Sequence, residues 1–183
     1  MNVLKNREIY ALATDKIWHN PANLSIKIKP FILTSVNPES YTLRAGENVT
    51  IYNQGEKTEA TIGTGSEGLW LHPETLYCIK VAEHIEFKNL NYLISGLNVI
   101  NATRPKNKKT DNFTVWIEPT QSRYIYRGMP IAEMRFIRDY VGEHLGIAPD
   151  VNNFFDSIDK KIDFRGVPQS PYVFDNRNRF EKK

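Results

Sequence analysis

Short segments in which apolar and polar residues alternate run through most of the chain, and they restrict its fold more than any other feature. Ile26 and Ile28 alternate with Lys27 and Lys29, as expected of a strand with one buried face. Comparable segments occur at residues 41–44, 48–52, 69–71, 76–81, 93–100, 113–117, 124–126 and 131–137. Many short strands at this spacing predict a β-sandwich or β-barrel rather than a parallel sheet with crossover helices.

Turn-forming residues separate these segments, at 45–47, 53–55, 63–68 and 127–128. The glycine-rich run at 63–68 lacks the lysine and the following helix of a phosphate-binding loop, so we interpret it as a flexible turn. The helical spacing of Leu4, Ile9 and Leu12 predicts one short helix within residues 3–14.

The chain changes character after residue 138. Residues 140–147 are compatible with a brief helical turn that ends at Gly146 and Pro149, and residues 154–158 form a second small apolar cluster. From residue 160 the chain is polar and irregular and cannot bury enough surface to fold alone. We therefore expect a β domain over residues 1–159 and a C-terminal arm over residues 160–183.

Composition excludes several classes of protein. With 40% hydrophobic and 25% charged residues, the chain is typical of a soluble globular domain, neither fibrous nor wholly disordered. No run approaches the ~20 apolar residues of a membrane span, and we expect a cytoplasmic or virion protein that is not secreted.

The single cysteine, Cys78, is expected to be a packing thiol. The scattered histidines, among them His72 and His84, indicate ordinary surface or hydrogen-bonded residues and neither a metal site nor a cofactor.

The net charge of +3 does not by itself indicate a nucleic-acid partner. Residues 104–109 form a basic loop that carries Arg104 and three lysines. We interpret this loop as a solvated hairpin tip, and the alternative is that it binds a triphosphate or nucleic acid. Nucleic-acid binding predicts an affinity that falls steeply with salt concentration.

Four collinear segments, which cover roughly residues 3–138, resemble motifs of the dCTP deaminase and trimeric dUTPase superfamily. The matching residues are Pro38, Ser40, Leu43, Arg44 and Gly46 in the first conserved motif, Val3, Leu4, Arg7, Glu8 and Ile9 at the N-terminal helix, Leu71, Pro73, Glu83 and Ile85 in a middle strand, and Gly128, Met129, Ile131 and Phe136 in a late strand. The resemblance implies a mostly β fold, a distorted jelly-roll β-barrel with a short N-terminal helix and an extended C-terminal arm. It also implies a homotrimer with sites at the subunit boundaries.

The departures from the family lie in the segments that carry its chemistry. The family's Gly-Arg-Ser-Ser segment, whose serines and arginine hold phosphates and position the base, corresponds here to residues 95–99. Leu97 stands for the arginine, and Asn98 and Val99 stand for the serines. The family's Ile-Asp-Pro-Gly-Phe loop is replaced by residues 101–112.

The general base of the deaminases is a glutamate in a strand that residues 113–118 resemble. Alignment of the strand pattern places Trp116 at that position, with Glu118 two residues further along and on the same face. Deamination of cytosine at C4 without a metal requires a carboxylate that takes a proton from water and returns it to the ring. Trp116 either stacks on a base or fills the core of a trimer, and we favour the second role.

We therefore predict a trimeric relative of this family that is catalytically impaired. It acts as a structural module, for example in a virus or phage capsid or tail, or as a module that binds a pyrimidine nucleotide. Its expected partners are further copies of itself and virion proteins, and neither a membrane nor nucleic acid is expected.

The alternative is an active dCTP deaminase or dUTPase with a rearranged site. In that site Glu118 is the base, Asn98 is a polar anchor, and Arg104 or Arg165 binds phosphate. Residues 161–170 resemble the family's closing arm, in which Arg165 and Gln169 would face the ligand. An arm that only clasps the adjacent subunit is the other interpretation.

Overall fold

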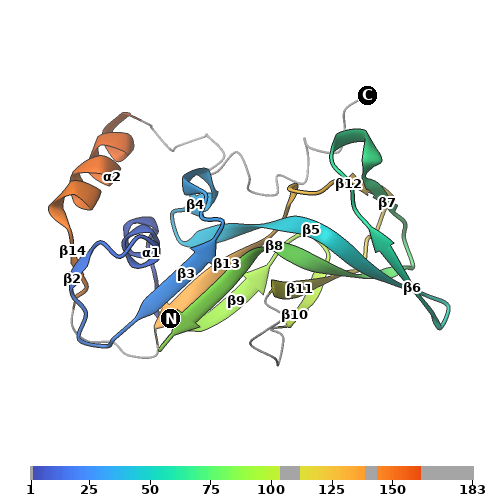
Figure 1. Ribbon diagram of the computed structural model, residues 1–183, viewed down its shortest axis with the longest axis horizontal. Helices are drawn as coiled ribbons and strands as arrows, with labels where there is room; N and C mark the ends of the chain where they lie inside the picture. The colour runs from blue at the N-terminus through green and yellow to red at the C-terminus, as the bar shows by residue number, and fades with distance from the viewer. Residues whose placement is uncertain (1, 104–111, 139–143, 162–183) are drawn as a thin grey trace. The chain divides into compact units, whose positions relative to one another are not determined.

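The computed structural model describes residues 2–103, 112–138 and 144–161 of the chain, and strands make up most of them (Figure 1). The strands are β1 Asn2–Val3, β2 Ile17–His19, β3 Ser25–Lys29, β4 Val36–Asn37, β5 Ser40–Asn53, β6 Glu56–Thr61, β7 Leu69–Leu71, β8 Leu76–Lys88, β9 Asn91–Ser95, β10 Val99–Thr103, β11 Asn112–Ile117, β12 Arg123–Ile125, β13 Pro130–Arg138 and β14 Gly146–Ile147. The helices are α1 Asn6–Ala13 and α2 Pro149–Lys161, with 3-10 turns at Leu33–Ser35 and Gly65–Glu67. The predicted mostly β class is confirmed.

Ten strands share one sheet, in which the main hydrogen-bonded order is β1-β13-β5-β8-β11-β10, with β3, β4, β6 and β9 beside this path. Two further ribbons pair β7 with β12 and β2 with β14, both antiparallel. The described residues fall into two compact units. The first unit takes its residues from Met1–Thr42, Ile85–Leu93 and Met134–Val173, and the second from Leu43–His84 and Ile94–Glu133.

In the first unit, helix α1 lies against strand β3 (Figure 1). Its buried residues Ile9 and Leu12 are three positions apart and share one apolar face, while the buried Ala11 packs on α2. At the start of the helix, the Glu8 carboxylate accepts a hydrogen bond of 2.8 Å from the Lys5 N–H, which satisfies one backbone donor there. The predicted N-terminal helix is confirmed.

Helix α2 was not predicted. The sequence analysis placed Pro149 at the end of a helical turn, but the structure places it at the start of a helix. Proline suits the first helical position because its missing N–H would be unpaired there in any residue. Val151 and Phe155 project from α2 onto Ala11 of α1, and all three are buried. Ile147 was expected in the helical turn and Gly146 at its end, but Gly146–Ile147 form strand β14 instead.

The core of the second unit follows the alternation of its strands. Val49, Ile79 and Val115 are direct partners across β5, β8 and β11, and each is at most 2% exposed. Side chains that point to one face of neighbouring strands pack on one another and leave the alternate residues on the other face. The turn predicted at 53–55 is confirmed, since Gln54 and Gly55, both with positive φ, join β5 to β6. Strand β6 was missed because its residues are mostly polar and exposed.

Two predicted boundaries are wrong. The turn expected at 45–47 is absent, because β5 runs unbroken from Ser40 to Asn53 and only shifts its register against β8 between Ala45 and Val49. Conversely, the strand expected at 93–100 is divided into β9 and β10 by a turn in which Asn98 has a φ of 57°. A glycine in a strand pattern marks a bulge or a turn, and sequence alone did not separate the two.

Candidate functional site

Trp116 occupies the position that the resemblance assigns to a general base. It lies on the face of β11 opposite the buried residues Phe113, Val115 and Ile117, and its side chain is half-buried. The Trp116 indole stacks on the ring of Tyr52, which projects from β5, with 5.4 Å between centroids and 27° between planes. Stacked aromatic pairs stabilise each other beyond the area that they bury. The position is therefore filled by an aromatic pair.

Glu118 follows directly after β11 and its residue is exposed. Its backbone N–H donates a hydrogen bond of 3.1 Å to the carbonyl oxygen of Asn98. The structure thus brings together two of the predicted site residues, although their main chains, and not their side chains, make the contact. An exposed carboxylate lacks the water-excluded environment in which charges act most strongly.

The side-chain amide nitrogen of Asn98 is buried in the turn between β9 and β10. In the part of the chain that the structure describes, its Nδ2 atom is buried and unpaired. The left-handed backbone of Asn98 fixes this residue in the turn between β9 and β10. An unpaired buried donor costs free energy, and ligand binding is one way to satisfy it.

The remaining predicted ligands, Arg104, Arg165 and Gln169, lie outside the described residues, as do the basic loop and the C-terminal arm. The site hypothesis therefore rests on Asn98 and Glu118 within the structure, and its phosphate-binding part stays a prediction.

Arg44 and Glu83, which match the family motifs, form an ion pair that the sequence analysis did not predict. The Glu83 carboxylate is fully buried and accepts one hydrogen bond from Arg44 Nε and one of 3.0 Å from the Arg44 N–H. Burial raises the pKa of Glu83, and the bonds from Arg44 oppose that shift. The alternation of β8 gave a signal for the burial of Glu83, since Glu83 lies on the same face as the buried Val81 and Ile85, but no signal for Arg44 as its partner.

Cys78 and His72 are the cysteine and one of the histidines considered as candidate reactive residues in the sequence. Cys78 is half-buried, and burial raises the pKa of its thiol, so the predicted packing role is the one that its surroundings favour. His72 is exposed, and its Nδ1 lies 3.3 Å from Ser122 Oγ.

Within residues 2–103, 112–138 and 144–161, no group of three His, Cys, Asp or Glu side chains is placed to hold a metal ion. Neither described helix has the length and apolar character needed to cross a membrane.

Comparison with known proteins defines the class of fold. No protein-family model matches the sequence, and no curated protein matches it. Among solved structures the chain resembles a dCTP deaminase. That protein is the 2′-deoxycytidine 5′-triphosphate deaminase from Agrobacterium tumefaciens, which aligns with a TM-score of 0.55 and 17% identity.

The alignment covers 74% of this chain and 47% of the deaminase chain, so this chain spans about half the length of its structural relative. At this level of identity the likeness concerns the fold. The predicted distorted β-barrel fold of the dCTP deaminase type is confirmed.

Proposed function

We propose that this protein is a catalytically impaired relative of the dCTP deaminases that assembles as a homotrimer. It acts as a structural module, or as a module that binds a pyrimidine nucleotide without converting it. For the structural role we propose a virus or phage capsid or tail, with virion proteins as its partners. A compact β-barrel repeated about a three-fold axis suits such an assembly because each copy presents the same surface to its neighbours.

One observation carries the proposal: the stacked pair of Trp116 and Tyr52 at the position expected of the general base. An indole ring has no basic group that could take a proton from water, so metal-free deamination at this position lacks its proton carrier. The fold supports the family relationship, and the aromatic pair supports the loss of catalysis.

A second candidate function has its own support. The backbone bond between Glu118 and Asn98 and the unpaired Nδ2 of Asn98 favour a rearranged site in which a polar ligand satisfies the amide. In this candidate the protein is an active dCTP deaminase or dUTPase with Glu118 as its base.

Turnover assays separate the two candidates. Ammonia release from dCTP and pyrophosphate release from dUTP are measured for the wild-type protein and for Glu118→Gln. We expect no release above the buffer rate for either protein. Turnover in the wild type that Glu118→Gln abolishes would establish the rearranged enzyme and refute the impaired module.

Thermal unfolding with nucleotides separates the structural role from the binding role. A nucleotide present at a hundred times its dissociation constant adds about 2.7 kcal/mol to the free energy of unfolding. A rise in Tm with dCTP or dUTP, reduced in Asn98→Ala, supports nucleotide binding. An unchanged Tm with all pyrimidine nucleotides supports the purely structural role.

A further inference from the structure

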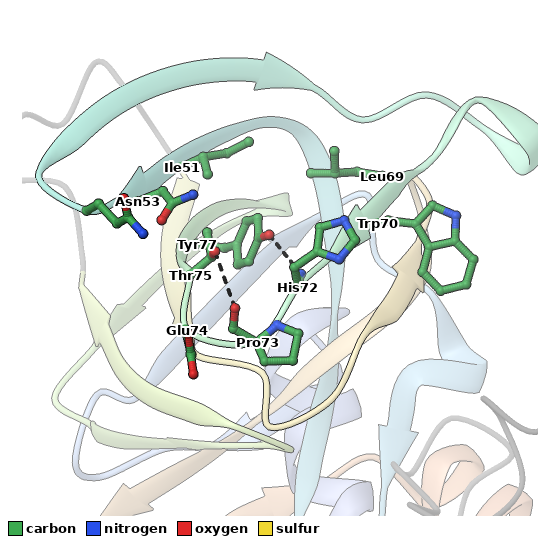
Figure 2. A pocket seen from close by; sticks show the side chains of 10 residues that line it. Ile51, Asn53, Leu69, Trp70, His72, Pro73, Glu74, Thr75 and Tyr77 are labelled. Atoms are coloured by element: carbon green, nitrogen blue, oxygen red, sulfur yellow. Dashed lines mark hydrogen bonds between the residues drawn. The ribbon is translucent and has the colours of Figure 1, made fainter.

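A cleft in the second unit lies apart from Trp116, Glu118 and Asn98. It has a volume of about 840 Å³ and lies between the β5–β6 turn and the loop that joins β7 to β8 (Figure 2). Its lining includes Asn53, Gln54, Trp70, His72 and Glu74. Clefts of this size accommodate a ligand of the size of one or a few sugar rings.

An exposed aromatic surface lies along one side of this cleft. The Trp70 side chain is 55% exposed, and Figure 2 shows the His72 ring between the rings of Trp70 and Tyr77. Trp70 is held from behind by Tyr124, its partner across β7 and β12, with 5.4 Å between ring centroids. Tyr124 is fixed in turn, because its hydroxyl donates to the Gly65 carbonyl oxygen at 2.8 Å. The indole is therefore a rigid, partly solvated platform.

Both rims of the cleft supply polar groups, Asn53 and Gln54 at the β5–β6 turn and Glu74 in the β7–β8 loop. The side chains of Asn53, Gln54 and Glu74 are exposed, and none has a hydrogen-bond or ion-pair partner in the part of the chain that the structure describes. Together they offer amide donors, amide acceptors and a carboxylate acceptor. A ligand with several hydroxyl groups can pair with all of these, since each hydroxyl both donates and accepts.

The charge of the lining restricts the ligand further. No lysine or arginine is among the described residues that line the cleft, and Glu74 is its carboxylate. Phosphate groups are bound in proteins chiefly by arginine, lysine and clustered backbone N–H groups. A carboxylate repels a phosphorylated ligand, so the lining favours a neutral ligand over a nucleotide.

The cleft is formed before any ligand binds. Gln54 and Glu74, on its two rims, have φ values of 47° and 62°, a left-handed conformation that seldom occurs outside tight turns. On the β7–β8 side, the His72 N–H donates to the Tyr77 hydroxyl at 2.8 Å. A site whose loops are already fixed loses less conformational entropy on binding.

We propose that this cleft is a binding site for a neutral carbohydrate. A pyranose ring has an apolar C–H face, which would lie against the Trp70 indole. Hydroxyl groups of further rings of the same oligosaccharide would pair with Asn53, Gln54 and Glu74, and Figure 2 places Asn53 and Glu74 on the other side of His72 from Trp70. This inference goes beyond the proposed function and does not depend on it, because the lining of the cleft does not include Trp116, Glu118 or Asn98.

The test uses the full-length protein on an array of neutral oligosaccharides built from glucose, galactose, mannose or N-acetylglucosamine. The dissociation constant of the tightest binder is then measured by calorimetry. We expect at least one neutral oligosaccharide to bind, and Trp70→Ala to weaken it by at least about tenfold, as loss of a central tryptophan anchor does. Glu74→Gln, which keeps the shape of the side chain, should weaken binding less than Trp70→Ala.

The matched control is Trp18→Ala, since Trp18 is another exposed tryptophan, 75% accessible, and belongs to the first unit. Its dissociation constant should equal that of the wild type, and circular dichroism checks that both variants fold. The proposal is overturned if no neutral oligosaccharide binds. It is also overturned if Trp70→Ala binds like the wild type, or if dCTP occupies the cleft and oligosaccharides do not compete with it. None of these results affects the turnover assays above.

Discussion

At the scale of single residues, the Arg44–Glu83 pair is an ion pair whose carboxylate is fully buried. The Glu83 side chain is 0% exposed and that of Arg44 is 18% exposed, so the carboxylate depends on its partner in place of water. The Lys57–Glu59 pair, at 3.5 Å, has side chains that are 57% and 75% exposed. An ion pair of the same type is therefore expected to contribute more to stability at the buried position than at the exposed one.

Removal of the buried carboxylate should destabilise the fold strongly. We expect Glu83→Ala to lower the free energy of unfolding by about 3–5 kcal/mol, because it leaves the Arg44 guanidinium without its partner. Glu59→Ala, which removes an exposed pair, should change it by about 0–1 kcal/mol. Urea unfolding of both variants measures the difference, and equal losses in the two variants would contradict this account.

The raised pKa of Glu83 predicts a dependence of stability on pH. Between the ordinary value of 4.5 and the higher pKa of folded Glu83, the folded chain binds more protons than the unfolded chain. The contribution of Glu83 to stability is thus fully present below pH 4.5 and is lost as the pH rises through the folded pKa.

Glu83→Gln removes this titration. We compare the free energy of unfolding of the wild type with that of Glu83→Gln. The wild-type value minus the variant value should fall as the pH rises from 4.5 through the pKa of folded Glu83. Urea unfolding at a series of pH values measures it. A difference that stays constant across the series would show that Glu83 does not titrate in this way.

At the scale of elements, Gly46 allows β5 to continue through its change of register. A Cβ atom at Gly46 would lie 2.5 Å from the Lys80 carbonyl oxygen and 3.2 Å from the carbonyl carbon of Val81. Both neighbours are backbone atoms of β8 and cannot rotate away. The close approach of β5 and β8 thus explains why a glycine is required at this position of the first motif in this chain.

Substitution of this glycine should cost stability. We expect Gly46→Ala to lower the free energy of unfolding by about 1–3 kcal/mol, the usual penalty for overpacking. The control is Gly55→Asn, since Gly55 has a φ of 86° and open space around its Cβ position. Asparagine tolerates the left-handed region, so this variant should unfold near the wild-type midpoint. Thermal unfolding by circular dichroism compares them, and a Gly46→Ala Tm equal to that of the wild type would rule out the close approach.

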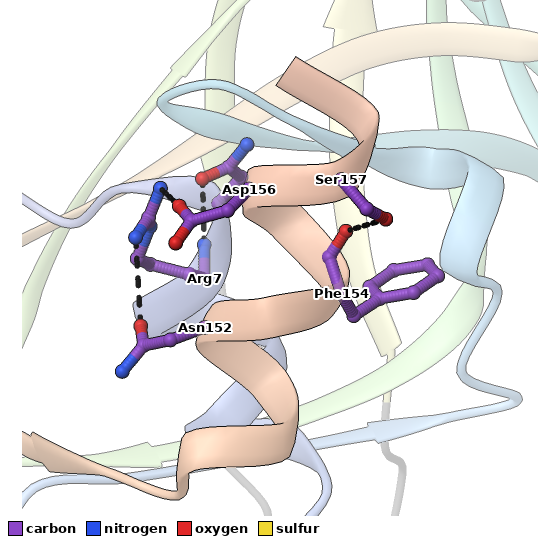
Figure 3. A network of polar contacts seen from close by, with 6 residues as sticks. Arg7, Asn152, Phe154, Asp156 and Ser157 are labelled. Atoms are coloured by element: carbon purple, nitrogen blue, oxygen red, sulfur yellow. Dashed lines mark hydrogen bonds and ion pairs between the residues drawn. The ribbon is translucent and has the colours of Figure 1, made fainter. Parts of the chain in front are cut away.

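Helix α2 is held on α1 by two kinds of contact. Arg7 forms an ion pair of 3.1 Å with Asp156, and its Nη1 lies 3.5 Å from Asn152 Oδ1 (Figure 3). The apolar contact is made by Phe155, which is 5% exposed and meets the Tyr10 ring edge-on at 5.7 Å. The ion pair is partly solvated, so the phenyl ring should dominate.

Two variants test which contact holds the helix. We expect Phe155→Ala to cost about 3–5 kcal/mol of local stability, as buried phenylalanines do. Arg7→Ala should cost about 0.2–1 kcal/mol, as a partly exposed pair does. Amide hydrogen exchange in residues 150–158 measures the loss of local stability in both variants. Faster exchange in Arg7→Ala than in Phe155→Ala would show that the ion pair, and not the phenyl ring, is the stronger contact.

At the scale of the whole molecule, the proposed homotrimer gives a direct prediction. Large apolar side chains such as Ile100 and Leu93 are 56% and 45% exposed in the single chain, and association is one way to cover such residues. Light scattering coupled to size exclusion should give three times the chain mass of 21.2 kDa over a tenfold range of concentration. A mass of one chain throughout that range would exclude the trimer.

Part of the fold could be predicted from the sequence because it depends on local pattern. The alternation in 113–117 and 131–137 fixes which face of each strand is apolar, and β11 and β13 lie where it predicts. The spacing of Ile9 and Leu12 fixed α1 in the same way. The candidate site was predicted less well: Asn98 and Glu118 are adjacent, while Arg104 and the residues of the arm lie outside the described chain.

The sequence by itself determined the class of fold and the positions of most strands, because alternation is a property of neighbouring residues. Only the tertiary structure decided that Arg44 is the partner of the buried Glu83, since Arg44 is 39 residues away on another strand. It also decided that Pro149 starts a helix, because the apolar side chains of α2 are buried against α1. Interactions between distant residues leave no periodic signal, so they become visible only when the strands and helices are packed together.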